Sequence, residues 1–192
     1  MRYEDGPTVE VEVAVDASPE KVWEAVCDIS VPARFSAELI EAAWVGGATG
    51  PALGARFVGR NQHPAIGRWE TTSVIAEYDP PRRLAWNVEN DGAVSASWRF
   101  EVLAEGDGTR LRQWGRMGPA PSGLTPAIAA RPDKEERIVA GRMDEWRRNM
   151  TATVEGIKAL VESGGAAGTR ASAGRWPAAP HRRRGPCPPS RP

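Results

Sequence analysis

The chain has 192 residues, and 25 lysines and arginines balance 25 aspartates and glutamates, so its formal net charge is zero. The balance is uneven, because residues 164–192 hold six arginines and no acid, which leaves 19 basic against 25 acidic groups in residues 1–163. The length suits one ordinary domain with a sizeable core. An acidic body excludes an extended nucleic-acid surface, and no apolar stretch approaches the roughly 20 residues that cross a bilayer.

The two ends and the cysteines indicate a compartment. The N-terminus, MRYEDGPTVEVEV, contains no hydrophobic signal core, which argues against export by that route. Cys27 and Cys187 lie 160 residues apart and form neither a disulfide framework nor a metal cluster. We therefore expect a cytoplasmic protein that uses no metal and no cofactor.

The first elements are a strand and a short helix. In Thr8–Val15, valines alternate with Glu10, Glu12 and Ala14, the period-two pattern of a strand with one buried face. Ser18 and Pro19 then provide a helix cap and first position. The helix runs to about Cys27, and residues 33–36 predict one more turn.

The pattern of residues 38–117 predicts a series of consecutive strands, separated by Gly-, Pro- and Asp-rich turns. Asp91-Gly92 is a tight-hairpin signal. Without a long helix between them, six consecutive strands predict an antiparallel meander. The predicted strands are 38–46, 54–62, 68–78, 83–90, 94–104 and 109–117.

A Gly/Pro-rich connection, 118–132, follows, with one short helix expected from Ser122. Residues 133–162 then predict the longest helix, opened by a capping box of Asp133 and Glu136. Its apolar stripe has spacings of three and four and consists of Val139, Met143, Trp146, Met150, Val154, Ile157 and Val161. Residues 164–192 show no periodicity and predict a disordered tail beyond a single domain, 1–163.

This order of elements resembles the helix-grip fold of the START-like (SRPBCC) superfamily. The local motifs that carry the resemblance are Asp16-Ala17-Ser18-Pro19-Glu20-Lys21-Val22-Trp23, Asp79-Pro80-Pro81-Arg82-Arg83-Leu84-Ala85-Trp86 and Gly108-Thr109-Arg110-Leu111. Phe57-Val58-Gly59-Arg60-Asn61 and Gly67-Arg68-Trp69-Glu70-Thr71 look like the polyketide cyclase/dehydrase-type branch. The resemblance covers residues 7–163. It implies an α+β fold, with a seven-stranded curved antiparallel sheet around the long C-terminal helix and an apolar cavity between them.

Catalytic motifs are mostly absent. The sequence contains no phosphate-binding loop, dinucleotide fingerprint, nucleophile elbow or HExxH zinc motif. His63 lies beside Pro64 and is expected to be a solvated loop residue. Cys27 is expected to be a small core residue rather than a nucleophile.

Polar residues on otherwise apolar strand faces are more informative. Asn61 lies opposite the arginine face of its strand, and Gln113 likewise, so both are predicted to point inward. There they could bind a ligand or satisfy buried backbone groups. Strand 68–78 has no cleanly apolar face, and a bulge could switch its faces. Glu70, if it faced inward, would be a weak acid–base candidate; exposure or pairing with an arginine is the alternative.

Tryptophans and methionines complete the predicted site, because both the core and the lining of such a cavity use large apolar groups. The predicted ligand-binding residues are Phe57, Asn61, Trp69, Thr71, Trp86, Trp98, Gln113, Met117, Met143, Trp146 and Met150. Trp114, on the arginine face, is expected to be partly exposed.

We therefore expect a protein that binds a hydrophobic small molecule, aromatic, polyketide-like or lipid, and that could act as a polyketide cyclase/dehydrase. The alternatives are a non-catalytic carrier or sensor of a lipid or quinone, and a cochaperone-like protein-interaction module. We expect no nucleic-acid partner, no membrane span, a monomer or homodimer, and a basic tail that is an inert extension.

Overall fold

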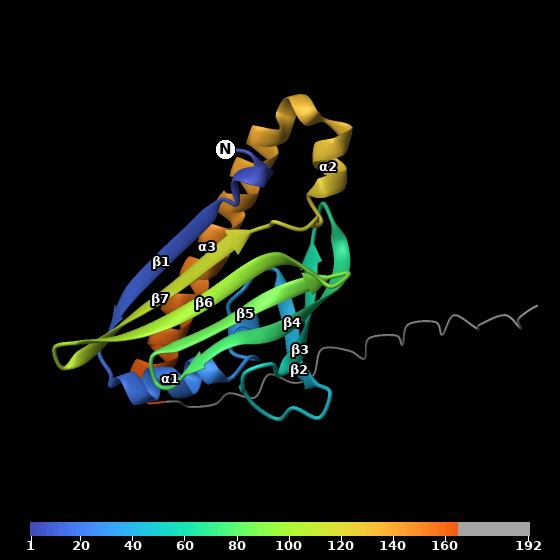
Figure 1. The fold of residues 1–192 in the computed structure, drawn as a ribbon. Coiled ribbons are helices and arrows are strands. Elements are labelled where there is room, and N and C mark those ends of the chain that lie inside the picture. Colours follow the sequence, from blue (N-terminus) through green and yellow to red (C-terminus); the bar gives the residue numbers. More distant parts are fainter. Residues whose placement is uncertain (165–192) are drawn as a thin grey trace, which may run out of the picture.

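A computed structural model of the chain describes residues 1–164, which form one sheet and the helices that cover it (Figure 1). The strands are β1 (Thr8–Val15), β2 (Leu39–Val45), β3 (Arg56–His63), β4 (Gly67–Asp79), β5 (Arg83–Asn90), β6 (Ala93–Glu105) and β7 (Gly108–Met117). The helices are α1 (Pro19–Cys27), α2 (Thr125–Ala130) and α3 (Glu135–Glu162), and the 3-10 turns are η1 (Tyr3–Asp5), η2 (Pro32–Arg34) and η3 (Pro132–Lys134). The predicted tail, 164–192, lies outside the described residues except for Gly164.

The sheet is antiparallel throughout, in the order β1-β7-β6-β5-β4-β3-β2. Strands β2 to β7 are a meander, and β1 pairs with β7 at the far edge. At the β5–β6 hairpin both Asp91 (φ 49°) and Gly92 (φ 79°) have positive φ, as a tight primed turn requires. The predicted fold class is confirmed, and each predicted strand end lies within two residues of the observed one.

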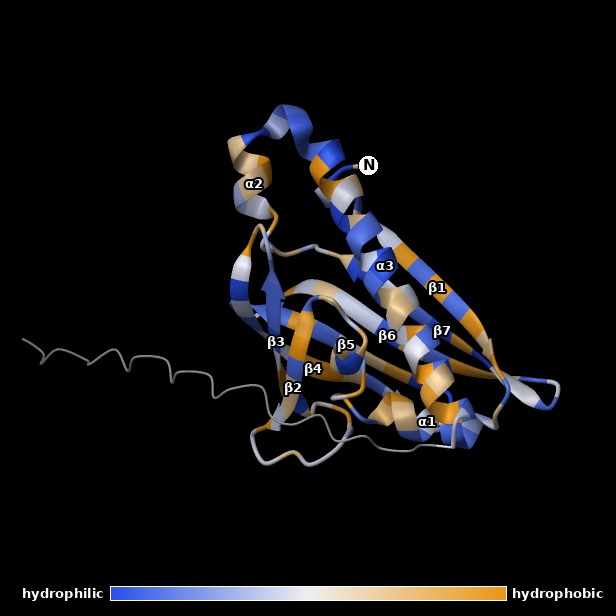
Figure 2. Cartoon of the chain, turned by 180° about the vertical axis from the view of Figure 1, so that it is seen from behind, coloured by the Kyte–Doolittle hydropathy of each residue, from blue (hydrophilic) through white to orange (hydrophobic). Residues whose placement is uncertain are grey.

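Helix α3 lies across the concave face of this curved sheet, with α1 at one end and α2 at the other (Figure 2). Its stripe is buried from Val139 to Ile157 and half-buried at Val161, and Val139, Val154 and Ile157 are almost wholly inaccessible. The core has two halves. Toward α1, the stripe packs with Val22, Ile75, Leu84, Phe100 and Leu111; toward α2, it packs with Val9, Ala96 and Met117. The sequence therefore predicted the buried face of α3 correctly.

The start of α3 differs from the prediction. The helix begins at Glu135, its N-cap is Lys134, and no side-chain cap is present. The predicted capping box of Asp133 and Glu136 is wrong, because Asp133 lies within the 3-10 turn η3 and not at the N-cap of α3. The N-terminal segment binds this end of the helix. Glu135 accepts hydrogen bonds from the Tyr3 amide at 3.0 Å and from Arg2 at 3.1 Å. The preceding short helix also starts later than Ser122, at Thr125, whose hydroxyl accepts the Ser122 amide hydrogen at 3.0 Å.

Strand β4 contains the bulge that its mixed pattern allowed. The register with β5 shifts between Ile75 and Glu77. Before the shift Ile75 is buried on the concave face. After it Tyr78 lies opposite the buried Leu84, and its ring is 5.9 Å from that of Trp23. The extra residue thus places Ile75 and the partly exposed Tyr78 on the same face of the sheet.

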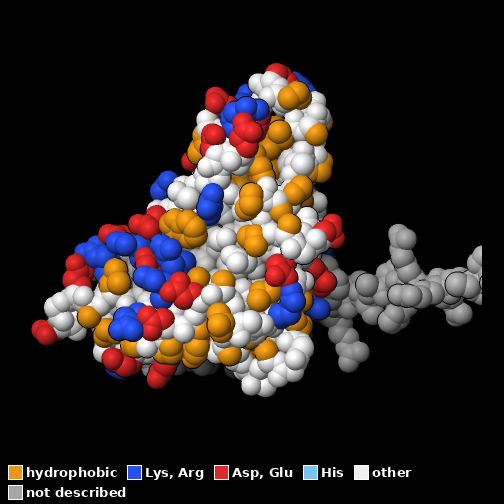
Figure 3. Space-filling model, in the orientation of Figure 1, with side chains coloured by type: hydrophobic (Ala, Val, Ile, Leu, Met, Phe, Trp, Pro, Cys, Tyr) orange, Lys and Arg blue, Asp and Glu red, His pale blue; other side chains and the backbone are white. Residues whose placement is uncertain are grey.

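The convex face of the sheet has a lattice of opposite charges, visible in Figure 3 as adjoining blue and red groups. Arg110 and Arg112 both bind Glu12 across β7 and β1. Arg99 lies 4.8 Å from the ring centre of Trp114, which is half-buried on this face, as its place among arginines predicted. Among the described helices, none combines the length and apolar character of a membrane span.

Candidate functional site

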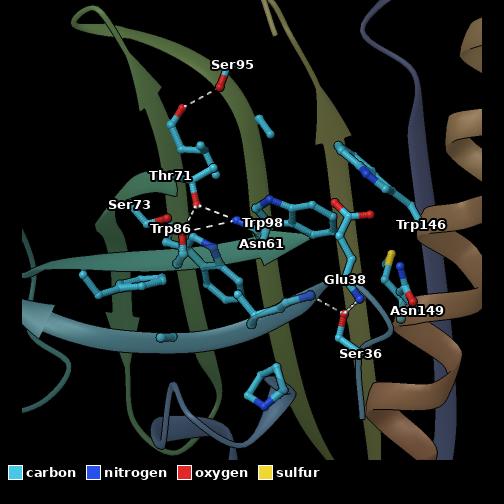
Figure 4. Close-up of a pocket in the computed structure, with 18 of the residues that line it drawn as sticks. Ser36, Glu38, Asn61, Thr71, Ser73, Trp86, Ser95, Trp98, Trp146 and Asn149 are labelled. Carbon is cyan, nitrogen blue, oxygen red and sulfur yellow. Dashed lines mark hydrogen bonds between the residues drawn. The ribbon is translucent and has the colours of Figure 1, made fainter. Parts of the chain in front are cut away.

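The space between the sheet and α3 is a cavity of about 460 Å³. Its walls come from the concave side of β3 to β7, from one face of α3, and from the loops before β2 and after β7. Figure 4 shows side chains from these elements converging on it. Ligand pockets in proteins span roughly 300 to 1,000 Å³, so this volume is enough for a small organic molecule.

Aromatic rings form the middle of the cavity wall. Trp86 and Trp98 are directly opposite one another on β5 and β6. The Trp86 ring centre is 6.1 Å from that of Phe57 and 5.8 Å from that of Phe100, and Trp98 lies 4.3 Å from Trp146 of α3. These tilted and edge-on contacts are the arrangements that aromatic quadrupoles favour. The rings therefore present apolar surface that can accommodate flat molecules.

A glycine makes room for one of these rings. A β-carbon on Gly115 of β7 would lie 2.7 Å from the ring of Trp98, closer than any side chain tolerates. Gly115 and Trp98 are cross-strand partners. The Trp98 ring therefore occupies the space that a side chain at residue 115 would need.

Polar groups from β3 and β4 lie on one side of the aromatic wall. Asn61 Nδ2 donates to the Gly59 carbonyl at 3.2 Å and to the Thr71 hydroxyl at 3.4 Å, and the Thr71 hydroxyl donates to the same carbonyl at 3.3 Å. Asn61 is buried and Thr71 half-buried, and both line the cavity together with Ser73. The Asn61 amide thus satisfies a backbone carbonyl, as one interpretation expected, while its carbonyl oxygen has no described protein hydrogen bond.

Gln113 lies on the β7 side of the cavity, with only 6% of its surface exposed. Its cross-strand partners are Val11 of β1 and Phe100 of β6, neither of which has a polar side chain. Its Oε1 atom is buried and has no hydrogen-bond partner among the described residues. Gln113 is therefore a polar group that the protein itself leaves unsatisfied.

A largely buried ion pair also lines the cavity, and no sequence pattern indicated it. Arg142 of α3 binds the Glu38 carboxylate through both terminal nitrogens, one at 2.7 Å, and also binds Glu145 at 3.0 Å. Burial alone would lower the pKa of Arg142, but the hydrogen bonds and charges of Glu38 and Glu145 raise it above its ordinary value. Local periodicity cannot reveal such a pair, because 104 residues separate its members.

His63 is not the solvated loop residue that was expected. It is the last residue of β3, and its Nε2 lies 3.4 Å from Glu145 of α3, with 22% of the side chain exposed. Its Nδ1 accepts the Ala65 amide hydrogen at 3.2 Å, which leaves Nε2 as the nitrogen that faces the carboxylate. His63 therefore links the β3–β4 turn to the same charged group as Arg142.

Most of the predicted ligand-binding side chains are brought together. Those that line the cavity are Phe57, Asn61, Trp69, Thr71, Trp86, Trp98, Gln113, Met117, Trp146 and Met150. Met143 does not line it and packs within the core cluster that also contains Val9 and Val139. The periodicity of α3 placed Met143 on the buried face but could not tell core from cavity wall.

Two candidates for chemistry have no free reactive group. The Glu70 carboxylate is half exposed and bonds Arg60 at 2.9 Å, and Arg60 also holds Glu41 on the outer face of β2 and β3. Glu70 therefore pairs with an arginine, which is the alternative that the sequence analysis left open, and it also lies among the residues that line the cavity. Cys27 packs beside the α1 core, and burial raises the pKa of its thiol to about 11. Within residues 1–164, no three His, Cys, Asp or Glu side chains form a group that could hold a metal ion.

Residues 6–162 match the protein family described as polyketide cyclase / dehydrase and lipid transport. The chain belongs to this family. The family match spans β1 through α3, and therefore every wall of the cavity. The comparison with curated protein sequences gave no match.

Solved structures that resemble this family member share its fold. The polyketide-cyclase-like protein Cgl2372 from Corynebacterium glutamicum is 25% identical, with 85% of this chain and 97% of that chain covered and a TM-score of 0.57. The Zhui aromatase/cyclase from Streptomyces sp. R1128 is 18% identical over 83% of this chain and 99% of that one, at a TM-score of 0.57. The di-domain aromatase/cyclase BexL of the BE-7585A biosynthetic pathway is 15% identical, with 83% and 51% covered and a TM-score of 0.63.

Proposed function

We propose that this protein binds a hydrophobic small molecule with an aromatic or polyketide-like framework in the cavity between the sheet and α3. The observation that carries the proposal is the aromatic wall of Trp86, Trp98 and Trp146 around a space of about 460 Å³. A ligand that fills this space removes apolar surface from water, at roughly 25 cal/mol per Å².

The shape of the lining favours flat rings over a flexible chain. The contacts of Trp86 and Trp98 with their aromatic neighbours present extended ring faces and edges to the cavity. Ring-to-ring contacts add about 0.5–1.5 kcal/mol beyond the area that they bury. An aromatic ligand also loses less conformational entropy on binding than an acyl chain of similar size.

Catalysis is the second candidate function, and the polar lining supports it in a limited form. The amides of Asn61 and Gln113 could polarise ligand carbonyls, and the walls could orient a reactive chain by proximity. Among the described lining residues, however, the carboxylates of Glu38, Glu70 and Glu89 each pair with an arginine. A binder or carrier therefore fits better than an acid–base enzyme, and an open interior argues against an interaction module that has no ligand.

Titration with the neutral fluorescent probe N-phenyl-1-naphthylamine tests binding in the cavity. The wild-type protein should enhance probe emission in a saturable way. Thr71→Trp should abolish this, because Thr71 lines the cavity. Thr72→Trp is the matched control, since residue 72 follows on the same strand and does not line it. Equal binding by the two variants would contradict the proposed site.

Two further measurements separate the candidate functions. Native mass spectrometry of protein purified from its own host should reveal a co-purifying ligand. Incubation with a poly-β-keto substrate mimic should alter the product distribution only if the protein is a cyclase. If the product distribution is unchanged and the probe binds saturably, the cyclase function is rejected and only the binding or carrier function remains.

A further inference from the structure

Gln113 is unusual among the polar residues of the cavity, because its buried oxygen has no partner. It lies on β7 between Leu111 and Gly115 on the concave face, with Val11 and Phe100 beside it. A buried acceptor without a donor costs free energy, which native proteins avoid unless another group supplies the bond.

Three of the hydroxyl groups around the cavity already donate their hydrogen to a backbone carbonyl. Thr153 of α3 donates to the Asn149 carbonyl at 2.8 Å, Ser95 donates to the Val88 carbonyl at 3.3 Å, and Thr71 donates to Gly59. Each hydroxyl has a single hydrogen to donate. The structure therefore leaves the Gln113 oxygen open to a donor among the contents of the cavity.

The charge around the cavity restricts the chemistry of that donor. Among the described residues that line the cavity, the only arginine or lysine is Arg142, which Glu38 and Glu145 already bind. Glu38 directly precedes β2, and β2 and β7 are separated by four strands of the sheet. An anionic group placed beside Gln113 would thus be buried without a cation, which is strongly unfavourable.

We infer that Gln113 accepts a hydrogen bond from a neutral hydroxyl or N–H group of the ligand, and so selects aromatic molecules that carry such a donor over hydrocarbons, ethers and carboxylates. This inference rests on the proposed function. The last torsion of a glutamine side chain is soft, so the amide can turn its oxygen toward a donor in the cavity. The aromatic wall would hold the rings while Gln113 fixes which end faces β7.

The test compares three probes that share one ring system: 2-naphthol, 2-methoxynaphthalene and 2-naphthoate. Wild-type protein should bind 2-naphthol about tenfold more tightly than 2-methoxynaphthalene, which lacks the donor, and should bind 2-naphthoate most weakly. Gln113→Met keeps a similar volume and should remove the preference for 2-naphthol. Gln62→Met, on the exposed face of β3, is the matched control and should retain it.

An independent measurement covers the case in which Gln113→Met fails to fold. In wild-type protein, saturating 2-naphthol should shift the NMR resonances of the Gln113 side-chain amide clearly further than saturating 2-methoxynaphthalene, because only 2-naphthol adds a hydrogen bond to the ring-current effect that both probes share. If both neutral probes bind equally well, or if Gln113→Met keeps the preference, the inference is wrong while the proposed function stands. If neither these probes nor N-phenyl-1-naphthylamine binds, both the inference about Gln113 and the proposed function are wrong.

Discussion

The phenyl ring of Phe35 lies so close to Gly156 of α3 that a β-carbon on residue 156 would come within 2.2 Å of the ring. Phe35 follows η2, and the chain then continues through Ser36 and Glu38, both of which line the cavity. The absence of a side chain at residue 156 thus lets this loop pack onto the helix. Through that contact, a helix glycine helps to position one wall of the site.

Gly156→Ala should destabilise the protein by about 1–3 kcal/mol, because the new methyl group overpacks a closed contact. Gly141→Ala in the same helix is the matched control. Nothing lies within 4 Å of a β-carbon there, so the substitution should stabilise the protein by about 0.5–1 kcal/mol. Urea unfolding measures both. The added cost of Gly156→Ala should vanish in a Phe35→Ala background, and its persistence there would show that the ring is not the cause.

Glu38→Gln should destabilise the protein by about 1–3 kcal/mol, because it leaves the largely buried Arg142 with Glu145 as its remaining carboxylate. Glu41→Gln should cost less than about 1 kcal/mol, since the pair of Glu41 with Arg60 is exposed. Chemical denaturation compares the two variants. The free energy of unfolding of the double variant Glu38→Gln with Arg142→Met should be closer to that of the wild type than the value for Glu38→Gln alone. Equal losses for Glu38→Gln and Glu41→Gln would contradict a buried, mutually dependent pair.

Cys27 should react slowly with iodoacetamide, because the thiolate is the reactive form and burial raises the pKa of this thiol to about 11. At pH 8 the thiolate fraction is then about 0.1%, against about 9% for the ordinary value of 9.0. Alkylation of a Cys187→Ser variant should therefore be about 100-fold slower in the folded protein than in urea. A folded rate close to the unfolded one would contradict the burial of Cys27.

The attachment of the N-terminal segment to α3 should weaken in acid. The hydrogen bond from the Tyr3 amide, followed by the one from Arg2, holds the pKa of Glu135 below its ordinary value of 4.5. When folding lowers the pKa of a carboxyl group, the group stabilises the fold fully at a pH above its unfolded-state pKa. This contribution is lost as the pH falls through the folded-state pKa. Above pH 4.5, Glu135→Gln should therefore lower the thermal midpoint, and below it the difference from wild type should shrink. Glu155→Gln, exposed on the same helix, is the control, and a pH-independent difference for Glu135→Gln would contradict this linkage.

Much of the fold could be predicted because each element depends on its own short stretch of sequence. Alternating valines in β1, turn residues such as Asp91-Gly92, and the apolar stripe of α3 each specify local geometry. The same alternation predicted that Asn61 and Gln113 face inward, since side chains on a strand alternate between faces. The fold and much of the cavity lining were therefore readable from periodicity.

Only the tertiary structure decided which side chains from distant parts of the chain come into contact. The pair of Glu38 and Arg142, the contact of Glu135 with the N-terminal segment, and the packing of Phe35 on Gly156 each join residues more than 100 positions apart. No local pattern encodes such contacts, and the bulge in β4 shifts faces by a single residue. The formal net charge of zero likewise gives no information about where the charged side chains lie in the structure. Local sequence determined the elements and their faces, and long-range packing determined that a cavity remained between them and which polar group in it was left without a partner.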